Sequence, residues 1–172
     1  MHRLWTDNLR YRWSAIRHSN SPVTTKVRQD LIPKKFEDIV KVAKTLRSNF
    51  VYTHDGIDRL FDSIDTPASC WERAFNPGPL EDDCDGFHSA LYWAVHQNFN
   101  CWLLTLVTRN IVNSHVILYI QHNGHYYVDY EYMSSKFNSF EALIEHIGKR
   151  RSMNIVSYNL SSWKDGWQKG GK

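Results

Sequence analysis

Three residues that could form a nucleophilic site occur along the chain in the order cysteine, histidine, aspartate. Cys84 follows the acidic run Glu81–Asp83, His115 lies at the start of an apolar segment, and Asp129 lies near the end of the next one. A cysteine attacks as its thiolate, so it needs a nearby base and a third group that orients the base. Cys84, His115 and Asp129 are residue types that can fill these three roles.

The residues around Cys84 predict that it lies in the first turn of a helix. Acidic residues favour a helix start, and apolar residues then recur at helical spacing at Phe87, Ala90, Leu91, Ala94 and Val95. A helix N-terminus stabilises a thiolate. The neighbouring carboxylates oppose it, so a cationic histidine from elsewhere in the chain is expected to offset them.

His115 and Asp129 lie on two segments that predict a hairpin. Residues 114–121 and 125–131 are rich in β-branched, aromatic and leucine side chains, and they flank His122-Asn123-Gly124. We therefore expect two antiparallel strands, with His115 at the start of the first and Asp129 near the end of the second.

The turn of this hairpin decides whether the two polar side chains can meet. A two-residue Asn123-Gly124 turn puts them on opposite faces, because side chains alternate along a strand. A three-residue loop, with Gly124 in the left-handed region, pairs Gln121 with His125 and makes the two side chains diagonal neighbours on one face. The Asn-Gly pair permits both turns, and a triad requires the three-residue loop.

The remaining pattern predicts an α+β fold with helices first and an antiparallel sheet second. Apolar periodicity indicates a helix from Phe36 to about Ser48 and a Ser139-capped helix that ends at Gly148. Strands are expected at 49–52, 101–108 and 153–158, and a short helix at 55–64. Thr66, Pro67 and residues 76–79 are typical of a long connecting stretch.

The chain of 172 residues fits one compact domain, expected over residues 35–160. Residues 1–34 form a basic, aromatic extension, and residues 161–172 are predicted to be a flexible tail. The net charge of +3 is too small to indicate nucleic-acid binding by itself. The basic arm could stack on bases and contact phosphates, although a packed or solvated extension is favoured.

No apolar run reaches the ~20 residues that cross a membrane, and no signal peptide is evident, so a cytoplasmic location is expected. The three cysteines lack the CxxC spacing of zinc or redox pairs, and no cofactor or metal is expected. Cys101 is predicted to lie in the core and Cys70 in a loop.

Other residues offer competing chemistry. His88 lies one helical turn after Cys84 and is an alternative base, but no carboxylate is obviously placed to fix its tautomer. His122 and His125 could join His115 and Asp129 in a metal site, although solvated turn histidines are more common. The acidic run from Glu81 matches the start of a calcium loop, but position 12 is Tyr92 instead of glutamate.

The order and spacing of these motifs resemble the transglutaminase-like, papain-like cysteine enzyme superfamily, in its bacterial form. The matching segments are Asp83-Cys84-Asp85-Gly86-Phe87, Ser114-His115-Val116 and Tyr127-Val128-Asp129, preceded by Asn49-Phe50-Val51-Tyr52 and Thr66-Pro67. The resemblance covers about residues 36–147. It implies a papain-like core in which the nucleophile helix packs on an antiparallel sheet. The family often has glycine where this chain has Asp82.

The resemblance implies a Cys84, His115, Asp129 triad that acts on amide, ester or thioester carbonyls, with a peptide or protein as the expected substrate. The expected activity is that of a cysteine peptidase or amidase, or of a related acyl transferase. The backbone N–H of Cys84 is one oxyanion donor, and Trp71, Asn76 and Tyr52 are candidates for the second. The alternatives are an inactive domain that binds protein or nucleic acid, and a metal-dependent hydrolase.

Overall fold

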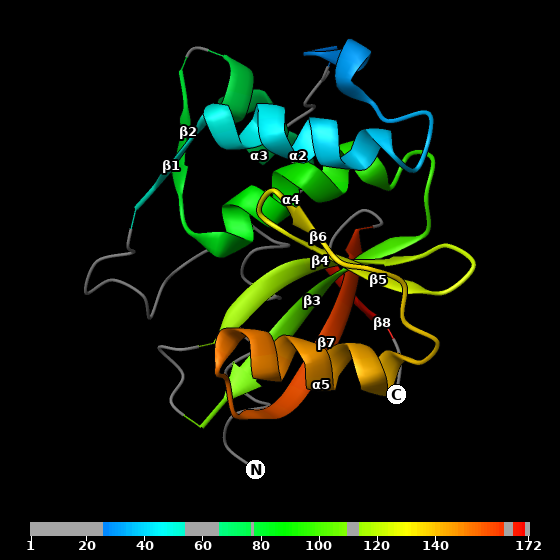
Figure 1. Cartoon of the computed structure of the whole chain (residues 1–172). Coiled ribbons are helices and arrows are strands. Elements are labelled where there is room, and N and C mark those ends of the chain that lie inside the picture. The colour runs from blue at the N-terminus through cyan, green and yellow to red at the C-terminus, as the bar shows by residue number, and fades with distance from the viewer. Residues whose placement is uncertain (1–25, 54–65, 77, 110–113, 164–166, 171–172) are drawn as a thin grey trace.

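The structure, a computed structural model, describes residues 26–53, 66–76, 78–109 and 114–163, together with the backbone of 167–170. Within these ranges it is a mixed α+β fold, as the sequence predicts (Figure 1). The predicted helix at 55–64 and most of the basic arm, residues 1–25, lie outside the described residues.

The centre of the molecule is an antiparallel sheet with the strand order β6-β5-β4-β3-β7-β8. The strands of this sheet, in chain order, are β3 (Cys101–Thr108), β4 (His115–Gln121), β5 (His125–Asp129), β6 (Tyr132–Met133), β7 (Ile155–Trp163) and β8 (Trp167–Gly170). A separate parallel pair joins β1 (Phe50–Tyr52) to β2 (Leu80–Asp82), which leads directly into the helix of Cys84.

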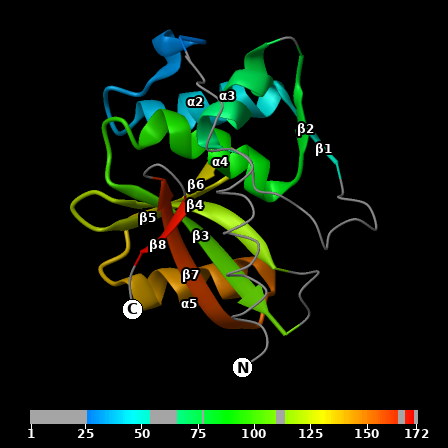
Figure 2. The same cartoon turned by 180° about the vertical axis from the view of Figure 1, so that it is seen from behind.

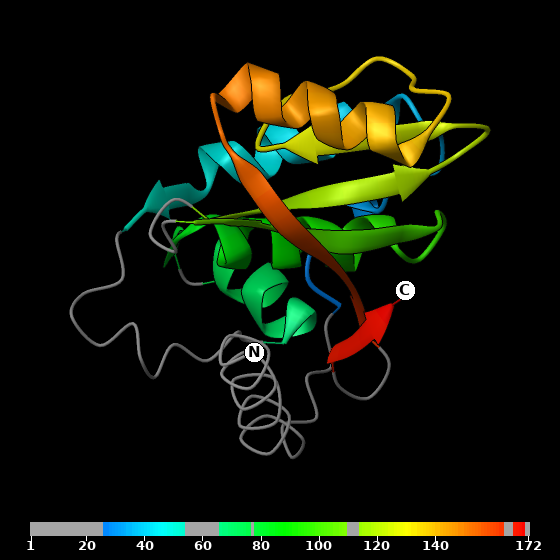
Figure 3. The same ribbon diagram turned by 90° about the horizontal axis from the view of Figure 1, so that it is seen from below.

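Helices cover both faces of the sheet. On one face lie α2 (Asp38–Ser48), α3 (Pro67–Phe75) and α4 (Cys84–Val95), and on the other lies α5 (Phe140–Arg151), as Figures 2 and 3 show from two directions. A short 3-10 helix, η1 (Gln29–Leu31), precedes α2. The Val27 and Pro33 carbonyls accept side-chain hydrogen bonds from Trp71 and Asn98, so residues 27–33 are joined to the body of the domain.

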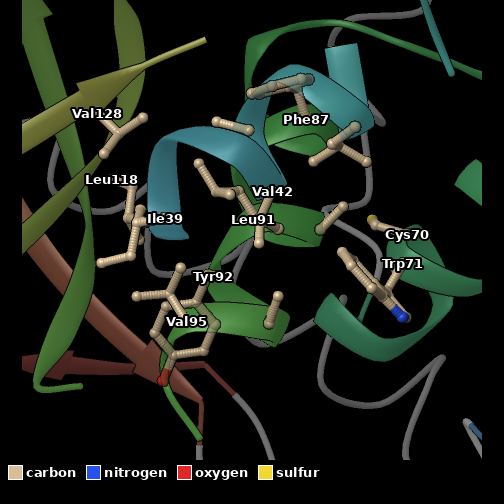
Figure 4. Packing of buried hydrophobic residues seen from close by; sticks show 14 of the residues in the cluster. Ile39, Val42, Cys70, Trp71, Phe87, Leu91, Tyr92, Val95, Leu118 and Val128 are labelled. Carbon is tan, nitrogen blue, oxygen red and sulfur yellow. The ribbon is translucent and has the colours of Figure 1, made fainter. Parts of the chain in front are cut away.

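Two apolar clusters hold the helices to the sheet. Figure 4 shows the larger one, in which Leu118 and Val128 of the sheet pack with Phe87, Leu91 and other residues of α2, α3 and α4. On the other face Leu104, Ile117 and Tyr127 pack with Leu143 and Ile147 of α5. Burial of one such aliphatic side chain stabilises the fold by about 1.5–3 kcal/mol, so the two clusters fix both layers.

The hairpin has the register that a triad requires. Gln121 pairs with His125, and the strands then pair through Leu118 and Val128, which confirms the three-residue loop. The loop differs in one detail from the prediction: Asn123 takes a left-handed φ of 52°, whereas Gly124 has a φ of 148°. Both angles are positive, and asparagine and glycine are the residues that tolerate them.

Some predicted elements are wrong in their bounds. The stretch after Thr66 is not a loop but α3, with Thr66 as N-cap and Pro67 in the first turn. Thr66 and Pro67 begin this helix for two reasons. The Thr66 hydroxyl accepts the N–H of Ser69, and Pro67 has no N–H that would be left unpaired in the first turn. As a consequence Cys70 is a buried core residue and not a loop thiol.

At the C-terminal end the fold extends further than predicted. Helix α5 does not stop at Gly148 but continues to Arg151, and Ser152 ends it with a left-handed φ. Strand β7 runs to Trp163, and β8 pairs with it, so part of the expected flexible tail belongs to the sheet. Pairing with β3 and β8 supplies the hydrogen bonds that the local sequence does not reveal.

Gly86 gives a stability test for the turn that presents Cys84. A Cβ atom at Gly86 would lie 2.6 Å from Cβ of Asp82, whose carboxylate is already held by Arg73 and by the N–H of Asp83. We expect Gly86→Ala to lower the free energy of unfolding in urea by about 1–3 kcal/mol because this turn must shift. The matched control is Gly78→Ala, where no atom lies within 4 Å of the new Cβ. Equal stability of the two variants would contradict the packing described.

Candidate active site

Cys84 is the first residue of α4, as predicted, and the turn before it is held by side-chain caps. The Asp83 carboxylate accepts the N–H of Asp85 at 3.0 Å, and the Asp85 carboxylate accepts the N–H of Gly86 at 2.9 Å. These bonds satisfy N–H groups of the first helical turn that otherwise have no partner. The Cys84 side chain is half-buried, whereas Cys70 and Cys101 are in the core.

His115 and Asp129 form a buried hydrogen bond. Nε2 of His115 lies 3.0 Å from Oδ1 of Asp129, and the two residues are 8% and 7% exposed. An ionised carboxylate only accepts hydrogen bonds, so Nε2 of the ring is the donor. In the neutral ring Nδ1 then has the lone pair, which is the arrangement a general base requires.

Arg151 completes this group from the last turn of α5. Its Nε donates to Oδ2 of Asp129 at 2.6 Å, and Nη2 donates to Oδ1 at 2.7 Å. The Asp129 carboxylate thus joins three elements: β4 through His115, its own strand β5, and α5 through Arg151. Sequence reasoning missed Arg151 because the helix was predicted to end three residues earlier; a continuous basic last turn, Lys149–Arg151, was the available signal.

The pairing keeps Asp129 charged. Burial by itself raises the pKa of the Asp129 carboxyl, but the hydrogen bonds from His115 and Arg151 outweigh it and hold the pKa far below its ordinary value. Asp129 is therefore a carboxylate at any pH where the protein could work.

His88, the competing base, has both ring nitrogens occupied. Nδ1 lies 2.6 Å from the carbonyl oxygen of Cys84, and Nε2 accepts the N–H of Tyr130 at 3.1 Å. The carbonyl can only accept and the amide can only donate, so the ring is fixed as one neutral tautomer. Burial, followed by the charge on His115, lowers the pKa of His88 to about 3. His88 therefore has no lone pair to offer to the thiol.

The sheet register places the His115–Asp129 pair on the α5 face, opposite to the face that α4 covers. His115 pairs with Leu106 and precedes Ile117 by two residues, so its side chain lies on the same face of the sheet as theirs. Leu106 and Ile117 pack toward α5. The helix of Cys84 and the pair approach each other at the end of the sheet, where β5 stops at Asp129. There the rings of His88 and His115 lie 5.9 Å apart.

The Cys84 sulfur lies at this sheet end, beside the backbone of β4. The N–H of Val116, the residue after His115, favours the thiolate by a hydrogen bond to the sulfur. Burial first, then the charges of Asp83 and Asp85, raise the pKa of the Cys84 thiol well above its ordinary value. No hydrogen bond joins the sulfur to the His115 ring in the part of the chain that the structure describes. In this state Cys84 is a neutral thiol.

The candidates for the second oxyanion donor lie in different environments. Trp71 is fully buried, and its indole N–H already donates to the carbonyl of Val27. Asn76 is the exposed C-cap of α3. Tyr52 ends β1 and pairs with Asp82, which precedes Cys84 by two residues. The charge of Tyr52 raises the pKa of Tyr130, so of the three candidates Tyr52 is the one that acts on the site.

A cavity of about 550 Å³ borders the site on the His115 side. It lies between the ends of β3 and β4 and the segment after α5, and its lining residues are Thr108, Arg109, Ser114, His115, Arg151, Ser152, Met153 and Asn154. Apart from Met153 the lining residues have polar or basic side chains, and the described ones include no carboxylate. Such a space suits a polar group of a substrate.

The residues of the alternative metal site are not brought together. His122 and His125 lie at the far end of the hairpin, roughly 20 Å from His115 at ~3.3 Å per residue. His122 stacks on Phe36, and His125 Nδ1 lies 2.7 Å from the Tyr119 hydroxyl. Among the described residues the only clustered ligand types are Asp82, Asp83 and Asp85, whose carboxylates bind Arg73 and neighbouring N–H groups.

Comparison with known proteins gives no relative: no family model, curated protein or solved structure matches the chain. The helices of the described residues include none that is long and apolar enough to cross a lipid bilayer.

The depressed pKa of Asp129 predicts a pH-dependent contribution to stability. Its folded-state pKa lies below the unfolded value of about 3.9, so its stabilisation is complete well above pH 4 and is lost as the pH falls below that value. We expect Asp129→Asn to lower the free energy of unfolding by about 3 kcal/mol at pH 7 because it breaks a buried charged network. The difference from wild type should shrink at pH 3 in urea titrations. The exposed change Glu37→Gln is the control, and a difference independent of pH would contradict the assignment.

The raised pKa of Cys84 predicts how its carboxylate neighbours control alkylation. Asp85→Asn keeps the oxygen that caps Gly86 but removes a charge that opposes the thiolate. We expect the rate of Cys84 alkylation by iodoacetamide at pH 8 to rise about three- to tenfold, which corresponds to a pKa lowered by about half to one unit. Mass spectrometry of the Cys84 peptide measures the alkylation rate, and Asp38→Asn is the control. An unchanged or slower rate for Asp85→Asn would show that the charge does not act on the sulfur.

Proposed function

We propose that this protein is a cysteine-dependent acyl hydrolase or acyl transferase with a papain-like, transglutaminase-type core. In this proposal Cys84 is the nucleophile, His115 the general base and acid, and Asp129 the group that orients His115. The observation that carries it is the buried hydrogen bond from His115 Nε2 to Asp129, located at the sheet end where Cys84 begins a helix.

The neutral thiol of the resting site implies that deprotonation accompanies attack. When a carbonyl substrate enters, Nδ1 of His115 takes the proton of Cys84 while the sulfur forms a bond to the carbonyl carbon. The electron pair of the C=O bond moves to its oxygen, which becomes an oxyanion. As the C=O bond re-forms, the bond to the leaving group breaks and His115 returns its proton to that group, leaving a thioester on Cys84.

A second round of the same steps releases the acyl group. His115 takes a proton from a water molecule or an amine, the new nucleophile attacks the thioester carbonyl, and Cys84 leaves and regains the proton. Water gives hydrolysis and an amine gives acyl transfer. Asp129 remains ionised throughout and stabilises the imidazolium form of His115 by its hydrogen bond.

Arg151 has a positioning role in this proposal. Its two hydrogen bonds hold the Asp129 carboxylate in one orientation, so that Oδ1 faces His115. A fixed carboxylate fixes the ring and its tautomer, and this reduces the reorganisation needed when the base takes up a proton.

A peptide or protein amide is the proposed substrate class. The polar cavity beside His115 offers room for a polar or anionic group on the side of the base, with Ser114, Ser152 and Asn154 as hydrogen-bonding side chains.

A second candidate function is a binding domain of the same fold that has no catalytic activity. The raised pKa of Cys84 favours it, because a thiol that is difficult to ionise is a poor nucleophile unless substrate binding changes its surroundings.

Acyl transfer to Cys84 can be tested with p-nitrophenyl acetate, an activated ester that needs no specific substrate pocket. We expect wild type to release p-nitrophenolate in a burst and to carry one acetyl group on Cys84, and Cys84→Ser to lose both. His115→Ala should reduce the burst rate by about 10²–10⁴-fold, which is the usual contribution of a general base. His122→Ala is the matched control, because this exposed histidine lies at the far end of the hairpin. Equal burst rates for wild type and His115→Ala would reject the catalytic proposal.

A further inference from the structure

The proposed site has one evident oxyanion donor, the backbone N–H of Cys84, and acyl transfer is usually assisted by two. Tyr130 lies at the centre of the site and has no role in the steps above. It directly follows Asp129, at the point where β5 ends.

The backbone of Tyr130 is held in an unusual conformation. Its φ is 52°, in the left-handed region that bulky residues rarely adopt. Its N–H donates to Nε2 of His88, and Nδ1 of the same ring lies 2.6 Å from the Cys84 carbonyl. The buried His88 thus links Tyr130 to the first residue of α4. The positive φ belongs to the tight turn in which Asp129 pairs with Tyr132, and this turn and the hydrogen bond to His88 together fix the Tyr130 backbone.

The ring of Tyr130 is fixed by its neighbours. Its centroid lies 5.0 Å from that of Phe87, 5.1 Å from that of His88 and 6.1 Å from that of His115. Phe50 of β1 lies 6.2 Å away, and the Arg47 guanidinium lies 5.9 Å from the ring. The ring therefore lies against His88 and His115, between the start of α4 and the His115–Asp129 pair.

The hydroxyl of Tyr130 is a neutral hydrogen-bond donor. Burial raises the pKa of Tyr130 most, and the Cys84 charge raises that pKa next, ahead of Tyr52 and Asp129. Cys84 is therefore the titratable group that acts most strongly on this phenol. The phenol keeps its proton throughout the neutral and mildly alkaline range.

We propose that the Tyr130 hydroxyl is the second oxyanion donor of this site, a catalytic residue that hydrogen-bonds the carbonyl oxygen of the substrate as Cys84 attacks. This inference rests on the proposed acyl-transfer function. The hydroxyl donates a hydrogen bond and keeps its proton, so the proton transfers between Cys84, His115 and the leaving group are unchanged. Tyr52, the other tyrosine near the site, is 44% exposed on a short strand and is less firmly held.

The test is Tyr130→Phe, which keeps the ring, its packing and the backbone N–H and removes only the hydroxyl. We expect the burst rate with p-nitrophenyl acetate to fall about 10²-fold. Alkylation of Cys84 by iodoacetamide displaces iodide at a saturated carbon and forms no oxyanion, so its rate should stay within about twofold of wild type. Tyr158→Phe, an exposed tyrosine on β7, is the matched control and should change neither rate.

The outcomes separate this inference from the proposed function. A fall in both rates would mean that Tyr130 acts on the sulfur or on the fold, and it would overturn the oxyanion role. If Tyr130→Phe keeps the wild-type burst rate and Tyr52→Phe loses it, the second oxyanion donor is Tyr52 and the inference about Tyr130 is wrong. If wild type and Cys84→Ser react alike with the ester, the acyl-transfer function itself fails, and the inference fails with it.

Discussion

The site depends on one charged interaction, the contact of the Asp129 carboxylate with His115 and Arg151. Oδ1 accepts from both residues and Oδ2 accepts from Arg151 alone, in a setting that is largely closed to water. Because each oxygen is occupied, the carboxylate cannot rotate without breaking a charge-assisted hydrogen bond. Strands β4 and β5 and helix α5 thereby meet at one carboxylate. This carboxylate fixes the orientation of the His115 ring.

A second constraint is the place where β5 ends. The His115–Asp129 pair belongs to the face of the sheet that α5 covers, whereas Cys84 begins a helix on the opposite face. A continuous strand would separate them. The positive φ of Tyr130 begins the tight turn that returns the chain as β6 directly after Asp129, and His88 of α4 accepts the N–H of Tyr130. The end of the strand therefore brings the start of α4 and the His115–Asp129 pair to one edge of the sheet.

The surroundings of Cys84 favour its neutral thiol. The helix N-terminus and the N–H of Val116 favour a thiolate, but burial and two aspartates that cap the same turn oppose it more strongly. The residues that build the helix start thus add to the effect of burial in holding the thiol neutral. In the proposed mechanism this makes the ionisation of Cys84 part of the reaction with substrate, and it limits unproductive oxidation or alkylation of the sulfur.

The sequence by itself determined the helix start at Cys84 and the two strands of the hairpin, and it left the turn between these strands open. Periodicity and caps placed Cys84 at a helix start, and alternation along the hairpin showed that His115 and Asp129 could share a face only with a three-residue loop. These features are local, since they depend on side-chain period and turn chemistry within about 20 residues. Tertiary structure decided the rest. Arg151, the locked tautomer of His88 and the position of Tyr130 arise from contacts between elements that are 22 to 42 residues apart. Which residues meet across such distances depends on how the layers pack, and no spacing within one segment encodes that.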